Sequence, residues 1–117
     1  MDIETLREYC LSKKAVGEGF PFGEDTLVFK VAGKIFLLVG LNNNPLQFNA
    51  KCDPEKALEL REQYDAVQPG YHMNKKHWNT VIADGRLSNS LLKEMIDDSY
   101  DLIVKSLSKN VKAGFEL

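Results

Sequence analysis

The densest group of side chains able to bind a ligand lies in residues 71–79, after a Pro69-Gly70 break. The group comprises Tyr71, His72, Met73, Asn74, Lys75, Lys76, His77, Trp78 and Asn79. Lysine suits phosphate, asparagine suits base edges or backbone, and an aromatic ring can stack on a base. The segment therefore predicts a nucleic-acid contact. The alternative is structural: Trp78 opens an apolar-alternating strand (Trp78, Thr80, Ile82), so its ring faces the helices and belongs to the core, and His77 and Asn79 bond to adjacent backbone.

Histidines, cysteines and glycines are not spaced as metal, nucleophile or phosphate sites require. His72 and His77 are five residues apart, which points them in different directions on a strand or a helix. Cys10 and Cys52 form no C-x-x-C pair and fall on apolar faces, so we expect reduced, buried, non-catalytic thiols. Gly17 and its neighbouring glycines precede a strand instead of joining a strand to a helix. We expect no cofactor, no metal and no enzymatic activity. An alternative is a small-ligand or unrecognised catalytic site at Tyr71, His72 and His77.

Length and charge set the class of protein. The chain has 117 residues, of which 44% are hydrophobic and 27% charged, and we predict a single domain over residues 1–117. The net charge of −2 argues against a general polyanion binder, yet residues 66–86 carry three cations against one carboxylate. An anion site would have to be local. No apolar run is long enough for a membrane span and the N-terminus has no signal character, so we expect a cytoplasmic monomer with no membrane contact.

The elements that must position these residues follow from periodicity. Asp2 and Asp53 are suited to cap helices, and Ser88 begins a third helical pattern whose apolar set includes Ser99. The Ala32-Gly33 turn makes its two flanking strands antiparallel. The expected helices are Ile3–Lys14, 54–65 and 88–109, and the expected strands are Thr26–Val31, Ile35–Leu41, Leu46–Cys52 and His77–Ala83. Residues 15–23 are expected to be loop, and Asp97-Asp98 a possible site of a bend. The order α-βββ-α-β-α predicts an α+β fold with two layers, an antiparallel sheet packed against helices.

Several short sequence segments, spread along the chain, resemble the MmcQ/YjbR family of small bacterial proteins. They are Phe20-Pro21-Phe22-Gly23, Asp25–Val31, Gly33-Lys34-Ile35-Phe36, Lys51-Cys52-Asp53-Pro54, Pro69–Asn79 and Asp98–Leu102. The resemblance implies a two-layer α+β fold similar to CyaY and to secretion chaperones. It also implies DNA binding by a double-wing arrangement, in which the Tyr71–Asn79 loop and the Gly33-Lys34 hairpin are the candidate wings. It implies no enzymatic activity.

Our sequence-based prediction is therefore a small DNA-binding domain whose partner is duplex DNA. Lysines would contact phosphates, amides and imidazoles would donate hydrogen bonds, and rings would stack. The predicted contact residues are Lys34, Tyr71, His72, Asn74, Lys75, Lys76, His77 and Trp78. The alternative prediction is a protein-interaction or chaperone-like module, in which the sheet face or a helical groove holds a partner peptide and the basic loop is structural.

Overall fold

The computed structural model describes all residues, 1–117, and confirms the α+β fold. Its helices are α1 (Ile3–Leu11), α2 (Pro54–Gln63), α3 (Asn89–Ser106) and α4 (Lys109–Gly114). Its strands are β1 (Val16–Gly19), β2 (Thr26–Val31), β3 (Lys34–Gly40), β4 (Leu46–Lys51), β5 (Val67–Pro69) and β6 (Trp78–Ala83). None of these helices combines the length and apolarity needed to cross a bilayer.

Every helix begins at a side chain that accepts a hydrogen bond from its first turn, and these caps explain where the helices start. Asp2 Oδ1 accepts a hydrogen bond from the Thr5 amide at 2.8 Å, and the Asp53 carboxylate accepts one from the Lys56 amide. Pro54 follows Asp53 as the first residue of α2, where its lack of an N–H leaves no helical hydrogen bond unmade. Ser88 and Ser108 cap α3 and α4 in the same way. The predicted starts of α1, α2 and α3 are therefore confirmed.

The six strands form one antiparallel sheet in the order β1-β2-β3-β4-β6-β5. The hairpin between β2 and β3 turns at Ala32 and Gly33, which have φ angles of 49° and 83°. Positive φ at both central residues gives the turn whose twist matches that of the strands it joins. The predicted antiparallel pairing of these strands is confirmed, and the hairpin fixes which side chains share a face.

Two strands and three helix ends differ from the sequence-based prediction, since α1 ends at Leu11 and not Lys14, and α2 ends at Gln63 and not at 65. β1 lies within residues 15–23, predicted as loop, because pairing with β2 outweighs the low strand preference of Gly17 and Gly19. β5 is a three-residue edge strand paired with β6. The C-terminal helix ends at Ser106, and a separate α4 follows. No break occurs at Asp97-Asp98, through which α3 runs continuously.

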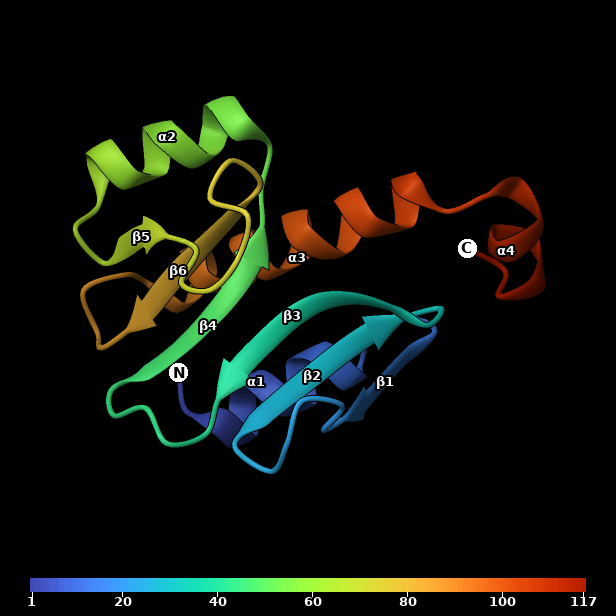
Figure 1. Cartoon of the computed structure of the whole chain (residues 1–117), viewed down its shortest axis with the longest axis horizontal. Coiled ribbons are helices and arrows are strands. Elements are labelled where there is room, and N and C mark those ends of the chain that lie inside the picture. Colours follow the sequence, from blue (N-terminus) through green and yellow to red (C-terminus); the bar gives the residue numbers. More distant parts are fainter.

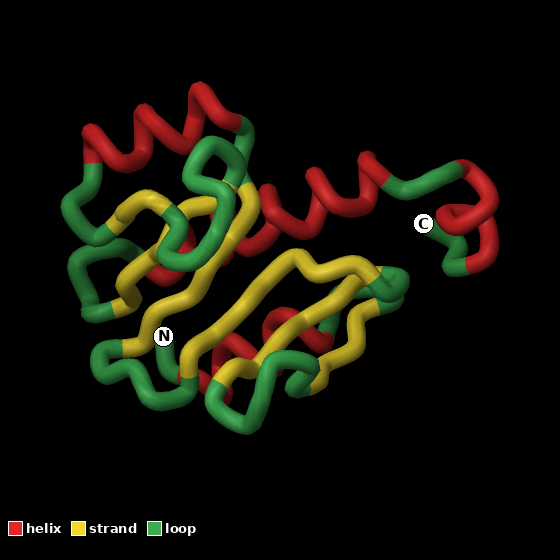
Figure 2. Tube along the Cα trace, in the orientation of Figure 1, coloured by secondary structure: helices red, strands yellow, loops and turns green.

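The hydrophobic core lies between one face of the sheet and the helices. α1 and α3 run behind the strands in Figure 1, and α2 lies along the β5–β6 end. The core cluster of 21 buried residues draws on both layers, with Phe29, Phe36 and Phe48 among its largest fully buried side chains. Figure 2 shows the opposite face of the sheet toward the viewer, where loops and no helix cross the strands. We call it the open face.

Trp78 lies on the open face, and the prediction that its ring faces the helices is wrong. Trp78 pairs with Lys51 in the β4–β6 ladder, while the neighbouring Asn79 points to α2 and donates to the Ala57 carbonyl. Asn79 and Val81 therefore occupy the helix-facing positions of β6. The alternation of Trp78, Thr80 and Ile82 predicted that these side chains face the helices. Asn79 faces the helices instead, because its polar atoms find hydrogen-bond partners there. The Trp78 ring is half-buried.

The sheet divides between β3 and β4, which pair at only three positions, from Leu37–Ala50 to Val39–Phe48. The two strands diverge beyond Leu37–Ala50 (Figure 1). The next pair would join Phe36 and Lys51. The hydroxyl of Ser99, from α3, occupies that place instead: it donates to the Phe36 carbonyl at 2.5 Å and accepts from the Lys51 amide at 2.8 Å. Ser99 is fully buried, so one side chain satisfies both backbone groups where the ladder stops.

Candidate ligand groove on the open sheet face

Residues 70–77, here called the basic loop, fold back over the open face and are fixed there by β4 and β6. The Tyr71 amide donates to Thr80 Oγ1 at 2.9 Å, and Asn49 Nδ2 donates to the Tyr71 carbonyl at 3.2 Å. The Thr80 hydroxyl in turn donates to Asn49 Oδ1 at 2.5 Å. Gly70 closes the loop against Trp78, since a Cβ at Gly70 would lie 2.8 Å from the Trp78 carbonyl oxygen. The loop is therefore a built part of the sheet surface.

Arg61 of α2 holds the far end of the basic loop. Its Nε donates to Asn79 Oδ1 at 2.7 Å, and its terminal nitrogen donates to the carbonyls of Lys75 and Trp78. A planar guanidinium can serve three acceptors at once, which an ammonium group cannot do in the same geometry. Sequence reasoning missed Arg61, because on a helix it resembled any other surface cation. The buried Asn79 opposite it was the available signal.

A groove of about 440 Å³ lies on the open face between the basic loop and residues 20–25, here called the aromatic loop. Its floor is formed by β3, β4 and β6, and the loop between β3 and β4, which contains Asn43, bounds one end. The lining residues are Phe22, Thr26, Leu38, Gly40, Asn43, Gln47, Phe48, Asn49, Tyr71, His72, Met73 and Thr80. The groove thus brings together two of the family-like segments, Phe20–Gly23 and Pro69–Asn79, which lie about fifty residues apart in the chain.

Aromatic rings stand at both sides of this groove and are open to solvent. Phe22 is 66% exposed and Tyr71 is 70% exposed, so both rings are accessible to a ligand in the groove. The Tyr71 ring also lies against the His72 ring, with centroids 4.0 Å apart. The remaining lining is amide, hydroxyl and apolar, without any lysine, arginine or carboxylate. Such a lining can stack on a planar group and hydrogen-bond its edge.

The structure gathers most of the predicted contact residues on one loop. Tyr71 and His72 line the groove, and Asn74, Lys75 and Lys76 are exposed beyond it. Lys75 Nζ donates to the Gly70 carbonyl at 3.1 Å, so this lysine also helps to close the loop.

Two further predicted residues, His77 and Trp78, join the basic loop to β6. Both are half-buried, and the His77 carbonyl accepts the Cys52 amide at 2.8 Å. Their positions are therefore fixed by the strand backbone.

Lys34 lies apart from the other predicted contact residues. It begins β3 at the hairpin tip, and its Nζ donates to Ser106 Oγ at 3.1 Å at the end of α3. In Figure 1 this hairpin lies at the α4 side of the molecule, whereas the basic loop lies near α2. The structure does not bring the two candidate wings together.

The strands carry their charges unequally between the two faces of the sheet. Glu18 is the only carboxylate in any strand, and it faces α1, where it accepts two hydrogen bonds from Arg7. Lys30 and Lys51 lie on the open face with no carboxylate partner, and Lys76 of the basic loop also has none. The strands therefore place lysines and no carboxylate on the open face, in a chain whose net charge is −2, while the loop of residues 20–25 at its rim carries Glu24 and Asp25.

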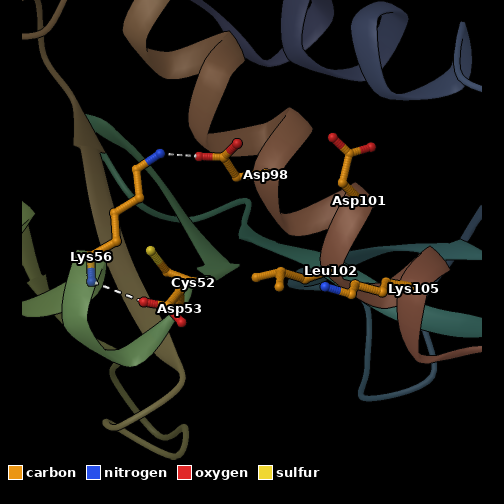
Figure 3. Close-up of a pocket in the computed structure, with 7 residues that line it drawn as sticks. All are labelled: Cys52, Asp53, Lys56, Asp98, Asp101, Leu102 and Lys105. Atoms are coloured by element: carbon orange, nitrogen blue, oxygen red, sulfur yellow. Dashed lines mark hydrogen bonds and ion pairs between the residues drawn. The ribbon is translucent and has the colours of Figure 1, made fainter.

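A second hollow of about 280 Å³ lies between α2 and α3 and contains Cys52 (Figure 3). Lys56 crosses it to reach Asp98, with the Nζ–Oδ2 distance at 2.6 Å. That ion pair raises the pKa of Lys56. The hollow is lined by two lysines and three aspartates, of which Lys56 and Asp98 form an ion pair with each other.

Both thiols are expected to react slowly with a maleimide at neutral pH, because the reactive species is the thiolate. Cys10 is fully buried, and burial raises its pKa to about 12. Burial also raises the pKa of Cys52, which is 7% exposed. Labelling should accelerate as pH rises above neutrality, with Cys52 reacting first. Mass spectrometry of native protein and of the Cys52→Ser variant tests this order. Rapid labelling of native protein at pH 7 would contradict it.

Comparison with known proteins identifies the family. The family model described as YjbR matches residues 11–102, a span that includes both loops of the groove and all six strands. The chain belongs to the YjbR family. The resemblance seen in the sequence is thereby confirmed, and the groove is a feature of the YjbR-matching part of the chain.

The relatives of this YjbR-family chain cover nearly its whole length. It is 41% identical to the uncharacterized protein YbdF of Escherichia coli O157:H7 over 91% of this chain and 87% of the relative. It is 34% identical to the uncharacterized protein YjbR of Escherichia coli K12, over 92% and 91% respectively.

Solved structures share the fold. The crystal structure of Deinococcus radiodurans protein DR2400 has a TM-score of 0.93 and 37% identity, covering 98% of this chain and 88% of that one. A Pseudomonas syringae protein has a TM-score of 0.74 and 28% identity, covering 87% of this chain and 98% of that one. A similar fold is therefore also found in experimentally determined structures.

Proposed function

We propose that this YjbR-family protein binds DNA with the open face of its sheet. The observation that carries the proposal is the separation of charge: no strand places a carboxylate on that face, and Lys30 and Lys51 lie there without acidic partners. The basic loop adds Lys75 and Lys76 at its rim. A local cationic surface can attract phosphates even where the net charge of the protein is slightly negative.

The proposed contact surface differs in one respect from the sequence-based prediction. Lys34 bonds to Ser106 beside α3, so the hairpin tip is left outside the proposed surface. Lys30 and Lys51 take its place, because the strand register puts them on the same face as the groove floor. Lys75 supports the loop as well as carrying charge, so its substitution would mix two effects. Lys51 and Lys76 are the better positions for a test.

Replacing Lys51 and Lys76 together by alanine is expected to weaken DNA binding and to flatten its salt dependence. Each lost phosphate contact should reduce the slope of log K against log salt by about 1. Thermal unfolding should change little, since Lys76 is exposed, Lys51 is half-buried and neither ammonium group has an ion-pair partner, and surface substitutions of this kind usually alter stability by no more than about 0.5 kcal/mol. Fluorescence anisotropy with a labelled DNA at several salt concentrations measures both quantities.

The matched control replaces Lys109 and Lys112 of α4, which removes the same charge away from the open face. The control should keep the wild-type salt slope. Equal weakening by both double variants would show that only overall charge matters. No wild-type binding at low salt would remove the DNA proposal.

A second candidate function, binding of a protein or peptide segment, is favoured by the uncharged lining of the groove. Exposed Phe22 and Tyr71 could pack on apolar side chains, and Leu38 and Met73 contribute further apolar surface. Such binding would lose little affinity as salt rises, because no lysine, arginine or carboxylate lines the groove. Salt dependence therefore separates the two candidates.

A further inference from the structure

We infer that the groove receives unpaired bases, so that the preferred ligand is single-stranded and not duplex nucleic acid. The inference rests on the proposed function but uses a separate observation. The proposal of DNA binding comes from lysines on the open face, whereas this inference comes from the shape and chemistry of the groove. The groove lining contains no lysine, arginine or carboxylate, so it suits the uncharged bases better than the phosphates.

The two exposed rings flank the groove from separate loops. Phe22 belongs to the aromatic loop and Tyr71 to the basic loop, and both line the same groove of about 440 Å³. Aromatic side chains bind single strands by stacking on base faces, and this stacking tolerates any base. In a duplex the neighbouring base pairs already cover those faces, so a base must leave the stack before a ring can reach it.

Free amides line the same groove. Gln47 and Asn43 make no side-chain hydrogen bond within the protein, although both line the groove. Each amide carries two N–H donors and a carbonyl acceptor, the groups that pair with the edge of a base. Asn49 differs, because its amide already bonds to Tyr71 and Thr80 and holds the loop. The groove thus combines ring surfaces with available edge-binding groups.

Phosphates would follow the basic-loop side of the groove, which carries lysines, and not the aromatic-loop side, which carries Glu24 and Asp25. Lys51 lies on the open face two residues from Asn49 of the groove floor, and Lys76 follows the groove residues in the basic loop. A strand whose bases enter the groove would therefore carry its phosphates past these ammonium groups. Cations along the path of the phosphates and aromatic rings for the bases are the combination that single-strand binding proteins use.

The test compares three labelled 12-nucleotide probes by anisotropy at one low salt concentration: a mixed-sequence DNA strand, its duplex and the corresponding RNA strand. The proteins are wild type, Phe22→Ala, Tyr71→Ala and Tyr71→Phe. The control is Leu58→Ala, which removes a 57% exposed apolar side chain from α2. Thermal unfolding of each variant confirms that the exposed substitutions leave the fold intact.

The expected result is single-strand affinity at least tenfold above duplex affinity. Each alanine variant should lose about 5- to 150-fold in affinity, the equivalent of one base–ring stack. The salt slope should not change, because the lysines remain. Tyr71→Phe and Leu58→Ala should bind as wild type does. Tighter binding to the RNA strand would still support the inference and would name RNA as the ligand.

Duplex affinity equal to or above single-strand affinity would overturn this inference and leave the proposed function standing. Unchanged single-strand binding in both alanine variants would also overturn it, since the rings would then make no contact. Absence of binding to all three probes would remove the proposed function and the inference together.

Discussion

Ser99→Ala is expected to lower the free energy of unfolding by about 2–5 kcal/mol, the sum for two buried backbone groups left without partners. The Ser99 hydroxyl bridges the Phe36 carbonyl and the Lys51 amide inside the core. Alanine has neither donor nor acceptor, and the fully buried position gives water no access. The predicted loss is a large fraction of the stability of a typical small domain.

Thermal or urea unfolding measures this effect, and the melting temperature should fall by roughly 8 °C or more. Ser106→Ala is the matched control. Its hydroxyl lies at the exposed end of the same helix, where it donates to the Ile103 carbonyl and accepts from Lys34. The control should change the melting temperature by only a few degrees. Similar small losses in both variants would show that the two strands close on each other when the hydroxyl is removed.

Arg61→Met is expected to destabilise the protein by about 2–4 kcal/mol and to release the basic loop, because hydrogen bonds from a charged donor contribute about 1.5–3 kcal/mol each and do not add fully. The guanidinium serves Asn79 and two loop carbonyls, at Lys75 and Trp78. Its loss leaves Asn79, which is 2% exposed, with a long bond to Ala57 as its remaining side-chain contact. Methionine keeps the apolar length of the side chain, so the change isolates the polar contacts.

Trp78 offers a direct measurement, since it is the sole tryptophan and lies beside the loop. Its emission should shift to longer wavelength in Arg61→Met, and amides of residues 71–77 should exchange faster. Arg61→Lys should not restore the wild-type values, because an ammonium cannot bridge the same three acceptors. The control is Arg86→Met, whose guanidinium bonds only to nearby Asp84. An unshifted Trp78 spectrum in Arg61→Met would contradict the anchoring role.

The central strands and the helix starts were predictable from local sequence because local chemistry determines them. Strict alternation defined β2 and β4, and Asp2, Asp53 and Ser88 marked the helix starts before the apolar patterns began. Ser99 fell on the inward face of its helix and is indeed buried. Its bridging bonds depend on where β3 and β4 separate, which no local pattern records.

The missed features depend on contacts between distant segments. β1 contains two glycines and β5 has three residues, so neither carries a strand pattern of its own, and both form by pairing with β2 and β6. The basic loop was recognised from composition. The aromatic loop on the other side of the groove was noted only as a segment that resembles the family, because a groove between residues 22 and 71 exists only after folding. Trp78 was placed on the wrong face because hydrophobicity alone decided its orientation.

The short pairing between β3 and β4 gives the sheet a seam, and the groove floor crosses it. Leu38 lies on one side of the seam in β3, and Asn49 lies opposite in β4. The aromatic loop leads into β2 on the first side, and the basic loop leads into β6 on the other. The distance between the two exposed rings is therefore set by the angle between two half-sheets. Ser99 lies at the pivot of that angle, so a core hydroxyl contributes to the width of a surface groove.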